Sequence, residues 1–160
     1  MERHMQTLFK TLFVGAILAI GTGTALAADA EIGSWKLNLA KSTFSPGPAP
    51  KSQTRTYAES AQGMTITIKT TAADGKESTQ TASFKDDGKP YVVSGNPDFD
   101  MVSLKRVDAS TVHVTQMKAG ATIGTAVRTV SKDRKTLTLA QKGTHASGGK
   151  FDDVLVFDRQ

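Results

Sequence analysis

The stretch MTITIK, residues 64–69, sets an apolar side chain against a polar one at every second position. Successive side chains of a β-strand point to opposite faces, so this pattern predicts a strand with one buried face and one face in water. The same alternation returns around Val102 and Leu104 and around Leu137 and Leu139. Apolar residues nowhere recur at helical spacing over a helix-length window, and the sequence therefore predicts an all-β chain.

Short turn signals separate the alternating segments. Ala73–Lys76 and Asp86–Lys89 both contain Asp-Gly, which favours the positive φ angles of tight hairpin turns. Connections this short join antiparallel neighbours, so the simplest topology is a meander. The predicted strands lie near residues 33–39, 51–59, 64–71, 77–85, 90–94, 101–107, 111–118, 121–130, 136–142 and 150–158.

The supply of large apolar residues favours one architecture. With about three of them per strand, the chain can line one face of every strand but not two. A single antiparallel sheet of about 8–10 strands that closes into a barrel meets this limit and leaves no exposed edges. A two-layer sandwich is the alternative, although it usually needs longer connections. A membrane-spanning barrel is not expected, because the outward positions are Thr, Ser and Lys rather than an apolar band.

The beginning of the chain has the layout of an export signal. Residues 1–27 combine a basic start, an apolar run and a small-residue end, Ala25-Leu26-Ala27, with cleavage expected before Ala28. The start could equally be Met5. We therefore expect a periplasmic or extracellular protein whose single domain spans residues 28–160, without stable membrane insertion after cleavage.

Composition excludes several classes of protein. The chain has no cysteine, which rules out disulfides and thiol catalysis. A net charge of +5, spread along the chain without a basic block, does not predict a nucleic-acid partner.

One segment departs from the alternating pattern of the predicted strands. Residues 45–51 form a Pro-rich strap that we expect to cross one end of the barrel, after a short helical turn near residues 40–44.

The start of the first predicted strand and the end of the last one resemble a known group of proteins. Gly33-Ser34-Trp35-Lys36-Leu37 opens the first strand and Arg159 closes the last. This G-x-W start, followed by a meander and a late basic residue, resembles the calycin group, which includes lipocalins and intracellular fatty-acid-binding proteins. The wider stretch from Trp35-Lys36-Leu37-Asn38 through Lys41-Ser42-Thr43-Phe44, with the Pro-rich strap, also resembles small secreted bacterial proteins that generally lack assigned functions. The resemblance implies a lipocalin-like barrel in which Gly33, Trp35 and Arg159 close one end, with the guanidinium on the indole.

Residues with catalytic or metal-binding chemistry are few. His113 and His145 are too far apart in sequence to form a histidine pair for a metal. Residues 96–100 place three oxygen-bearing side chains at alternate positions, but Met101 and Val107 stand where a calcium loop needs Gly and Glu. We therefore predict no metal and no cofactor. The sequence does not predict an enzyme, and an uncharacterised hydrolase-like activity is the remaining alternative.

The barrel interior is the predicted site of function. We expect it to bind a small apolar or amphipathic molecule. If Arg106 points inward with Val102 and Leu104, it would pair with a ligand carboxylate or with Asp153; the alternative is that it lies at the strand end, bends to solvent and binds nothing. The predicted ligand-binding residues are Tyr57, Tyr91, Met101, Arg106 and Phe157. The alternative is a filled barrel that acts through its surface, as a binder or inhibitor of proteins in the cell envelope. A monomer is expected in either case.

Overall fold

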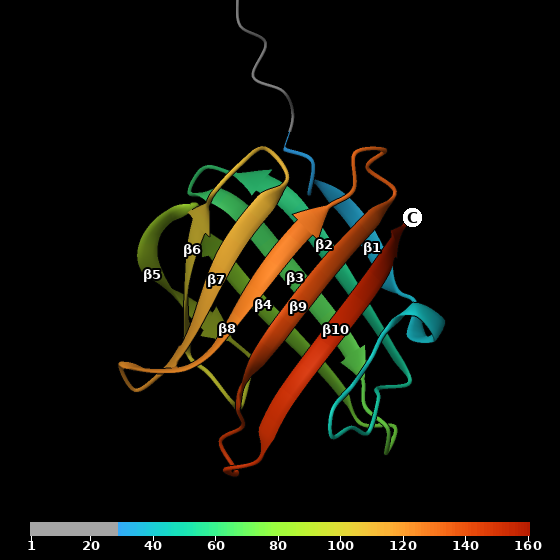
Figure 1. The fold of residues 1–160 in the computed structure, drawn as a ribbon. Helices are drawn as coiled ribbons and strands as arrows, with labels where there is room; N and C mark the ends of the chain where they lie inside the picture. The colour runs from blue at the N-terminus through green and yellow to red at the C-terminus, as the bar shows by residue number, and fades with distance from the viewer. Residues whose placement is uncertain (1–28) are drawn as a thin grey trace, which may run out of the picture.

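Ten antiparallel strands form a single closed barrel in the computed structural model, which describes residues 29–160 (Figure 1). The signal-peptide prediction, with its cleavage site and alternative start, lies outside the described residues. The strands are β1 (Gly33–Leu37), β2 (Ser52–Ser60), β3 (Gly63–Thr71), β4 (Glu77–Phe84), β5 (Asp87–Ser94), β6 (Met101–Arg106), β7 (Thr111–Lys118), β8 (Ala121–Val130), β9 (Thr136–Thr144) and β10 (Lys150–Arg159).

The topology is the predicted meander. Each strand pairs with the next along the chain, and β1 pairs with β10 to close the sheet, with Trp35 opposite Arg159. Closure excludes the two-layer sandwich. The predicted strand ranges agree with the observed ones to within about three residues, because the turns that end the strands were marked by Gly, Asp and Pro.

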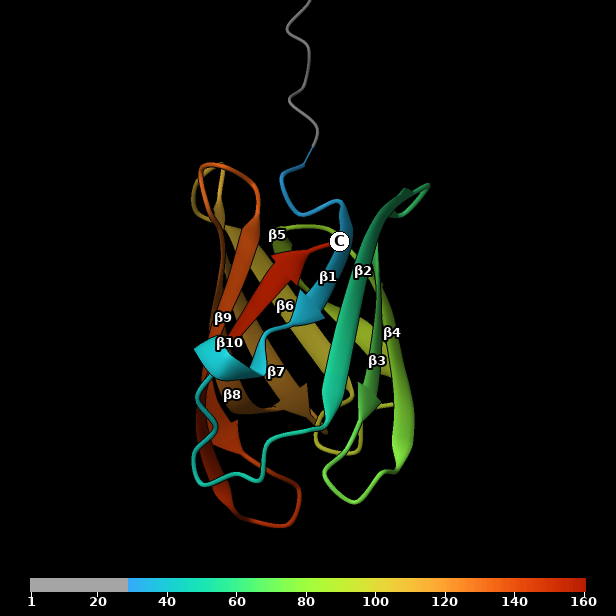
Figure 2. The ribbon, with the colours of Figure 1, turned by 90° about the vertical axis from the view of Figure 1, so that its right-hand side faces the viewer.

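The segment between β1 and β2 runs beside β10 before it reaches β2. It contains a short 3₁₀ helix, Leu39–Lys41, slightly earlier than the predicted turn. Beyond this helix, Thr43 exchanges backbone hydrogen bonds with Val154, and the Asp152 amide donates to the Ser45 carbonyl. The strap, residues 45–51, thus starts beside β10 and leads to β2 along the side of the barrel (Figure 2). Among residues 29–160, no helix is long and apolar enough to cross a membrane.

One end of the barrel is plugged by residues 29–35 together with Arg159, and we call it the plugged end. The Trp35 side chain is fully buried, and its Nε1 donates a hydrogen bond of 2.8 Å to the Glu31 carbonyl. The Arg159 guanidinium lies 4.1 Å from the centre of the Trp35 ring. The same group donates to three carbonyl oxygens, those of Ala30, Ile32 and Arg134.

Gly33 is needed at this end for a steric reason. Its φ of +128° is unfavourable for residues with a Cβ, and a Cβ there would lie 2.6 Å from the Arg159 guanidinium. Both termini of the described chain meet here, where the Gln160 amide donates to the Ser34 carbonyl. The end opposite carries the connections β3–β4, β5–β6, β7–β8 and β9–β10, and we call it the cavity end.

Replacing Arg159 with methionine should open the plugged end. The variant loses the stacking on Trp35 and three charge-assisted hydrogen bonds, so the free energy of unfolding should fall by about 2–4 kcal/mol. Urea denaturation followed by fluorescence measures this directly, since Trp35 is the one tryptophan of the chain. The native emission of the variant should also shift to the red. Lys36→Met, on the outer face of β1, is the matched control and should change neither quantity.

Candidate functional site

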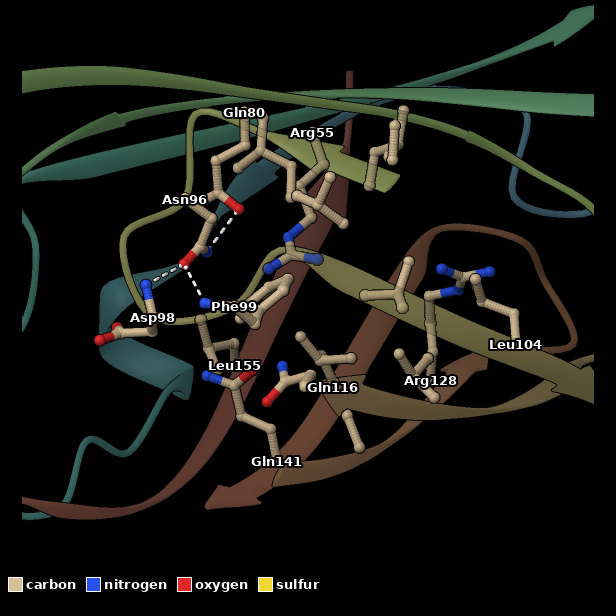
Figure 3. Close-up of a pocket in the computed structure, with 18 of the residues that line it drawn as sticks. Arg55, Gln80, Asn96, Asp98, Phe99, Leu104, Gln116, Arg128, Gln141 and Leu155 are labelled. Carbon is tan, nitrogen blue, oxygen red and sulfur yellow. Dashed lines mark hydrogen bonds between the residues drawn. The ribbon is translucent and has the colours of Figure 1, made fainter. Parts of the chain in front are cut away.

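The barrel interior holds a cavity of about 190 Å³ towards the cavity end (Figure 3). Inward positions of the strands supply an apolar wall, and the β5–β6 connection adds Phe99. The apolar lining residues are Ile66, Ile68, Ala82, Phe84, Val93, Phe99, Val102, Leu104, Val114, Ala126, Leu139, Phe151 and Leu155. The polar ones are Gln53, Arg55, Gln80, Thr81, Asn96, Asp98, Gln116, Arg128, Gln141 and His145. A mainly apolar cavity with a few convergent polar groups is the usual form of a small-molecule site.

Arg55 is the most unusual group in this lining. It shares the inward face of β2 with Tyr57, and only 9% of its surface is exposed. Its Nε donates to Gln53 Oε1 at 3.1 Å, and its guanidinium lies 4.9 Å from the centre of the Phe157 ring. Within residues 29–160, no carboxylate lies within 4.0 Å of it. Burial lowers the pKa of Arg55, but a guanidinium remains protonated in proteins.

Arg128, by contrast, has a counter-ion. It faces the cavity from β8, and one of its terminal nitrogens lies 2.5 Å from Glu31 Oε2. Both side chains are almost completely buried, and the guanidinium stacks on the Tyr57 and Phe84 rings at 5.0 and 5.7 Å. Burial raises the pKa of the Glu31 carboxyl, and the positive charge of Arg128 acts against that rise. The pair links the plugged end to the cavity.

Gln116 presents an amide to the cavity from β7. It is 6% exposed, and its Oε1 is buried without a hydrogen-bond partner among residues 29–160. The neighbouring strand makes room for it with Gly124, where a Cβ would lie 2.5 Å from that oxygen. Gly124 stands opposite Gly143 of β9, and a Cβ at Gly143 would lie 2.5 Å from the Ile123 carbonyl. Two glycines thus allow a close approach of β8 and β9 beside the cavity.

Two connections meet at the rim of the cavity. Asp98, in the β5–β6 connection, accepts one hydrogen bond of 2.8 Å from the Ala146 amide, and its Oδ2 lies 2.9 Å from His145 Nδ1. Asn96 holds the turn by accepting from the Asp98 and Phe99 amides. The oxygen-bearing residues 96–100 therefore serve to join connections and to form a turn. His113 is exposed on the outer face of β7.

The five predicted ligand-binding residues lie elsewhere. None of them is among the residues that line the cavity. Tyr57 and Phe157 are buried in the core towards the plugged end. Arg128 lies over the Tyr57 ring, and Arg55 lies over the Phe157 ring. The Tyr91 hydroxyl donates to Asp87. Met101 neighbours the inward Val102 and so points to the opposite face of the sheet.

Arg106 differs from its expected pairing. It is only partly buried at the plugged end, where it forms ion pairs with Asp29 at 2.7 Å and Asp86 at 2.5 Å. Asp153, the expected partner, instead accepts hydrogen bonds from the Ser45 amide and the Gln141 side chain. Sequence reasoning could not anticipate this because residues 29–31 fold back onto the barrel end, which is a long-range event.

Sequence reasoning did not single out Arg55, Arg128 or Gln116. The signal for the first two was present. Arg55 stands two residues before Tyr57, and Arg128 stands between Ala126 and Val130 at the same spacing, so both share an apolar face. A basic residue on the apolar face of a predicted strand therefore marks an inward charge.

The topology defines the class, a closed up-and-down barrel with a plugged end and an interior cavity. No family model and no curated protein sequence matches the chain. A search of solved structures finds similarity to zebrafish ileal bile acid-binding protein, crystallised in complex with cholic acid. The TM-score is 0.48 at 10% sequence identity, over 82% of this chain and 99% of the zebrafish chain.

Replacing Gly143 with alanine should strain the contact between β8 and β9. The added Cβ meets backbone atoms that cannot turn away, so the free energy of unfolding should fall by about 1–3 kcal/mol. Gly149→Ala is the control, because its Cβ would meet only the His145 ring, at 4.0 Å. Chemical denaturation compares the two variants, and equal stabilities would contradict the packing described here.

Proposed function

We propose that the protein binds a small amphipathic acid inside the barrel. The observation that carries the proposal is Arg55, a buried cation that faces the cavity without a carboxylate partner in the described chain. An unpaired buried charge is costly, and a ligand anion would remove that cost. The apolar wall would bury the rest of the molecule. The presence of a cavity favours this function over that of a filled barrel acting through its surface.

The size of the cavity limits the ligand. Its volume of about 190 Å³ lies below the 300–1,000 Å³ common for drug-sized molecules, yet far above the space for one water. A medium-chain carboxylate such as octanoate is therefore a suitable probe. Its carboxylate would contact Arg55, and the chain would lie against residues such as Ile68, Val114 and Leu155.

Arg55→Met should abolish most of the affinity for octanoate. A charge-assisted hydrogen-bonded contact contributes about 1.5–3 kcal/mol, so the Kd should rise roughly 10- to 100-fold. Calorimetry or fluorescence titration gives the Kd. Octan-1-ol, which has no charge, should bind the variant and the parent protein similarly. Arg134→Met, a change in the exposed β8–β9 turn, is the matched control and should leave both affinities unchanged.

The purified protein offers a second test that needs no chosen ligand. Solvent extraction followed by mass spectrometry should release an acidic small molecule from the parent protein and little or none from Arg55→Met. Recovery of equal amounts of the same acid from both proteins would contradict the role of Arg55. Recovery of a neutral molecule alone would count against an acidic ligand.

We also infer that the protein is exported. The layout of residues 1–27 supports a signal peptide, and cleavage before Ala28 would leave the domain in the periplasm or outside the cell. Intact mass measurement of the protein from cell fractions tests this. We expect the mass of residues 28–160 in the exported fraction, and a full-length mass there would contradict it.

A further inference from the structure

Two buried arginines face the cavity, but only one has a counter-ion. Arg55 and Arg128 both project into the space shown in Figure 3. The carboxylate of Glu31 lies 2.5 Å from Arg128, whereas no carboxylate in residues 29–160 reaches Arg55. The two cations are close enough to interact. Burial lowers the pKa of Arg55, the Tyr57 hydroxyl acts against that fall, and the positive charge of Arg128 adds to it. The interior therefore has two cationic positions and one internal anion.

The other charged groups near these arginines have contacts of their own. Arg106 contacts Asp29 and Asp86 at the plugged end, and it reaches Glu31 only at 3.7 Å. At the rim, Asp98 lies beside His145, and both are partly exposed to solvent. The charge inside the barrel is thus set by Arg55, Arg128 and Glu31. These three groups leave one positive charge for a ligand.

Glu31 is held in place by more than its ion pair. Its backbone carbonyl accepts the hydrogen bond from Trp35 Nε1, and its amide donates to Asp29 Oδ1. Only 2% of its surface is exposed. A ligand carboxylate that approached Arg128 would have to displace this fixed group or lie beside it. Two buried carboxylates in contact repel each other strongly, because the interior screens charge poorly.

We propose that Glu31 determines the charge of the ligand, and that by occupying Arg128 it makes the cavity select singly charged acids over doubly charged ones. This inference rests on the proposed function. It assigns Glu31 as a specificity-determining residue that acts through Arg128, at a distance from the anchoring position at Arg55. A doubly charged acid is disfavoured for two reasons. Glu31 repels its second carboxylate, and Arg128, which could bind that carboxylate, is already paired with Glu31.

Octanoate and octanedioate are matched probes, because they share a chain length and differ by one carboxylate. At neutral pH the parent protein should bind octanoate more tightly than octanedioate by about tenfold or more. Glu31→Gln keeps the side-chain shape and the carbonyl that accepts from Trp35. Once Glu31 is neutral, Arg128 becomes available, so the affinity for octanedioate should rise about tenfold while that for octanoate changes less than about threefold.

Glu59→Gln is the matched control. It removes an exposed carboxylate from the same end of the barrel, and Glu59 forms no ion pair among residues 29–160. The ratio of the two affinities should stay that of the parent protein. A parent protein that prefers octanedioate, or a Glu31→Gln variant with an unchanged ratio, would overturn the proposal.

A second variant keeps the test decisive if Glu31→Gln does not fold, which circular dichroism would show. Glu31→Leu combined with Arg128→Met replaces the buried ion pair by apolar side chains, a change that proteins often tolerate. This double variant should bind octanoate through Arg55 within about threefold of the parent Kd and gain no affinity for octanedioate. Loss of octanoate binding in the double variant would make Arg128 the anchor and overturn the assignment.

Failure of the proposed function gives a different result. If the parent protein binds neither probe, or if Arg55→Met binds octanoate as well as the parent does, the acid-binding function fails and this inference fails with it. If Arg55→Met loses octanoate binding while Glu31→Gln leaves the ratio unchanged, only the role assigned to Glu31 is overturned.

Discussion

Closure of the sheet is the constraint on which the rest of the structure depends. In a closed barrel, the inward half of every strand has no route to bulk water except through the two ends. Apolar side chains gain from this enclosure, and polar ones must find partners there. The β1–β10 pairing that completes the ring also places Arg159 over Trp35, so the same contact closes the wall and plugs one end.

Of the two buried arginines inside the barrel, one has a counter-ion among the described residues and the other does not. Arg128 is compensated by Glu31, which the chain supplies from the segment preceding β1, and it is stacked on aromatic rings. Arg55 has a glutamine and an aromatic ring but no carboxylate within the described residues. The cavity therefore combines a mainly apolar lining with one buried cation, Arg55, that has no carboxylate partner among residues 29–160. It is the physical basis of the proposed recognition of a small acid.

Different segments of the chain meet at the plugged end and at the cavity end, because strand direction alternates along the meander. In a meander, alternate connections lie at opposite ends, so the segment before β1 meets Arg159, Arg106 and Asp86 at one end. The β5–β6 and β9–β10 connections meet at the other end, where Asp98 joins them above the cavity. The β7–β8 connection joins them there, since Lys118 donates to the Pro97 carbonyl and the Ala119 amide donates to Asp100.

Local sequence determined the strands, their turns and the closed meander, because alternation and Asp-Gly turns act over a few residues. Alternation within β6 places Met101 on the face opposite to Val102, which is also a local property. Only the tertiary structure decided which charged groups meet, because residues 29–31 return to the plugged end and there pair Asp29 with Arg106 and Glu31 with Arg128. Which of several inward charges remains without a partner depends on residues distant in sequence, and no local pattern records that.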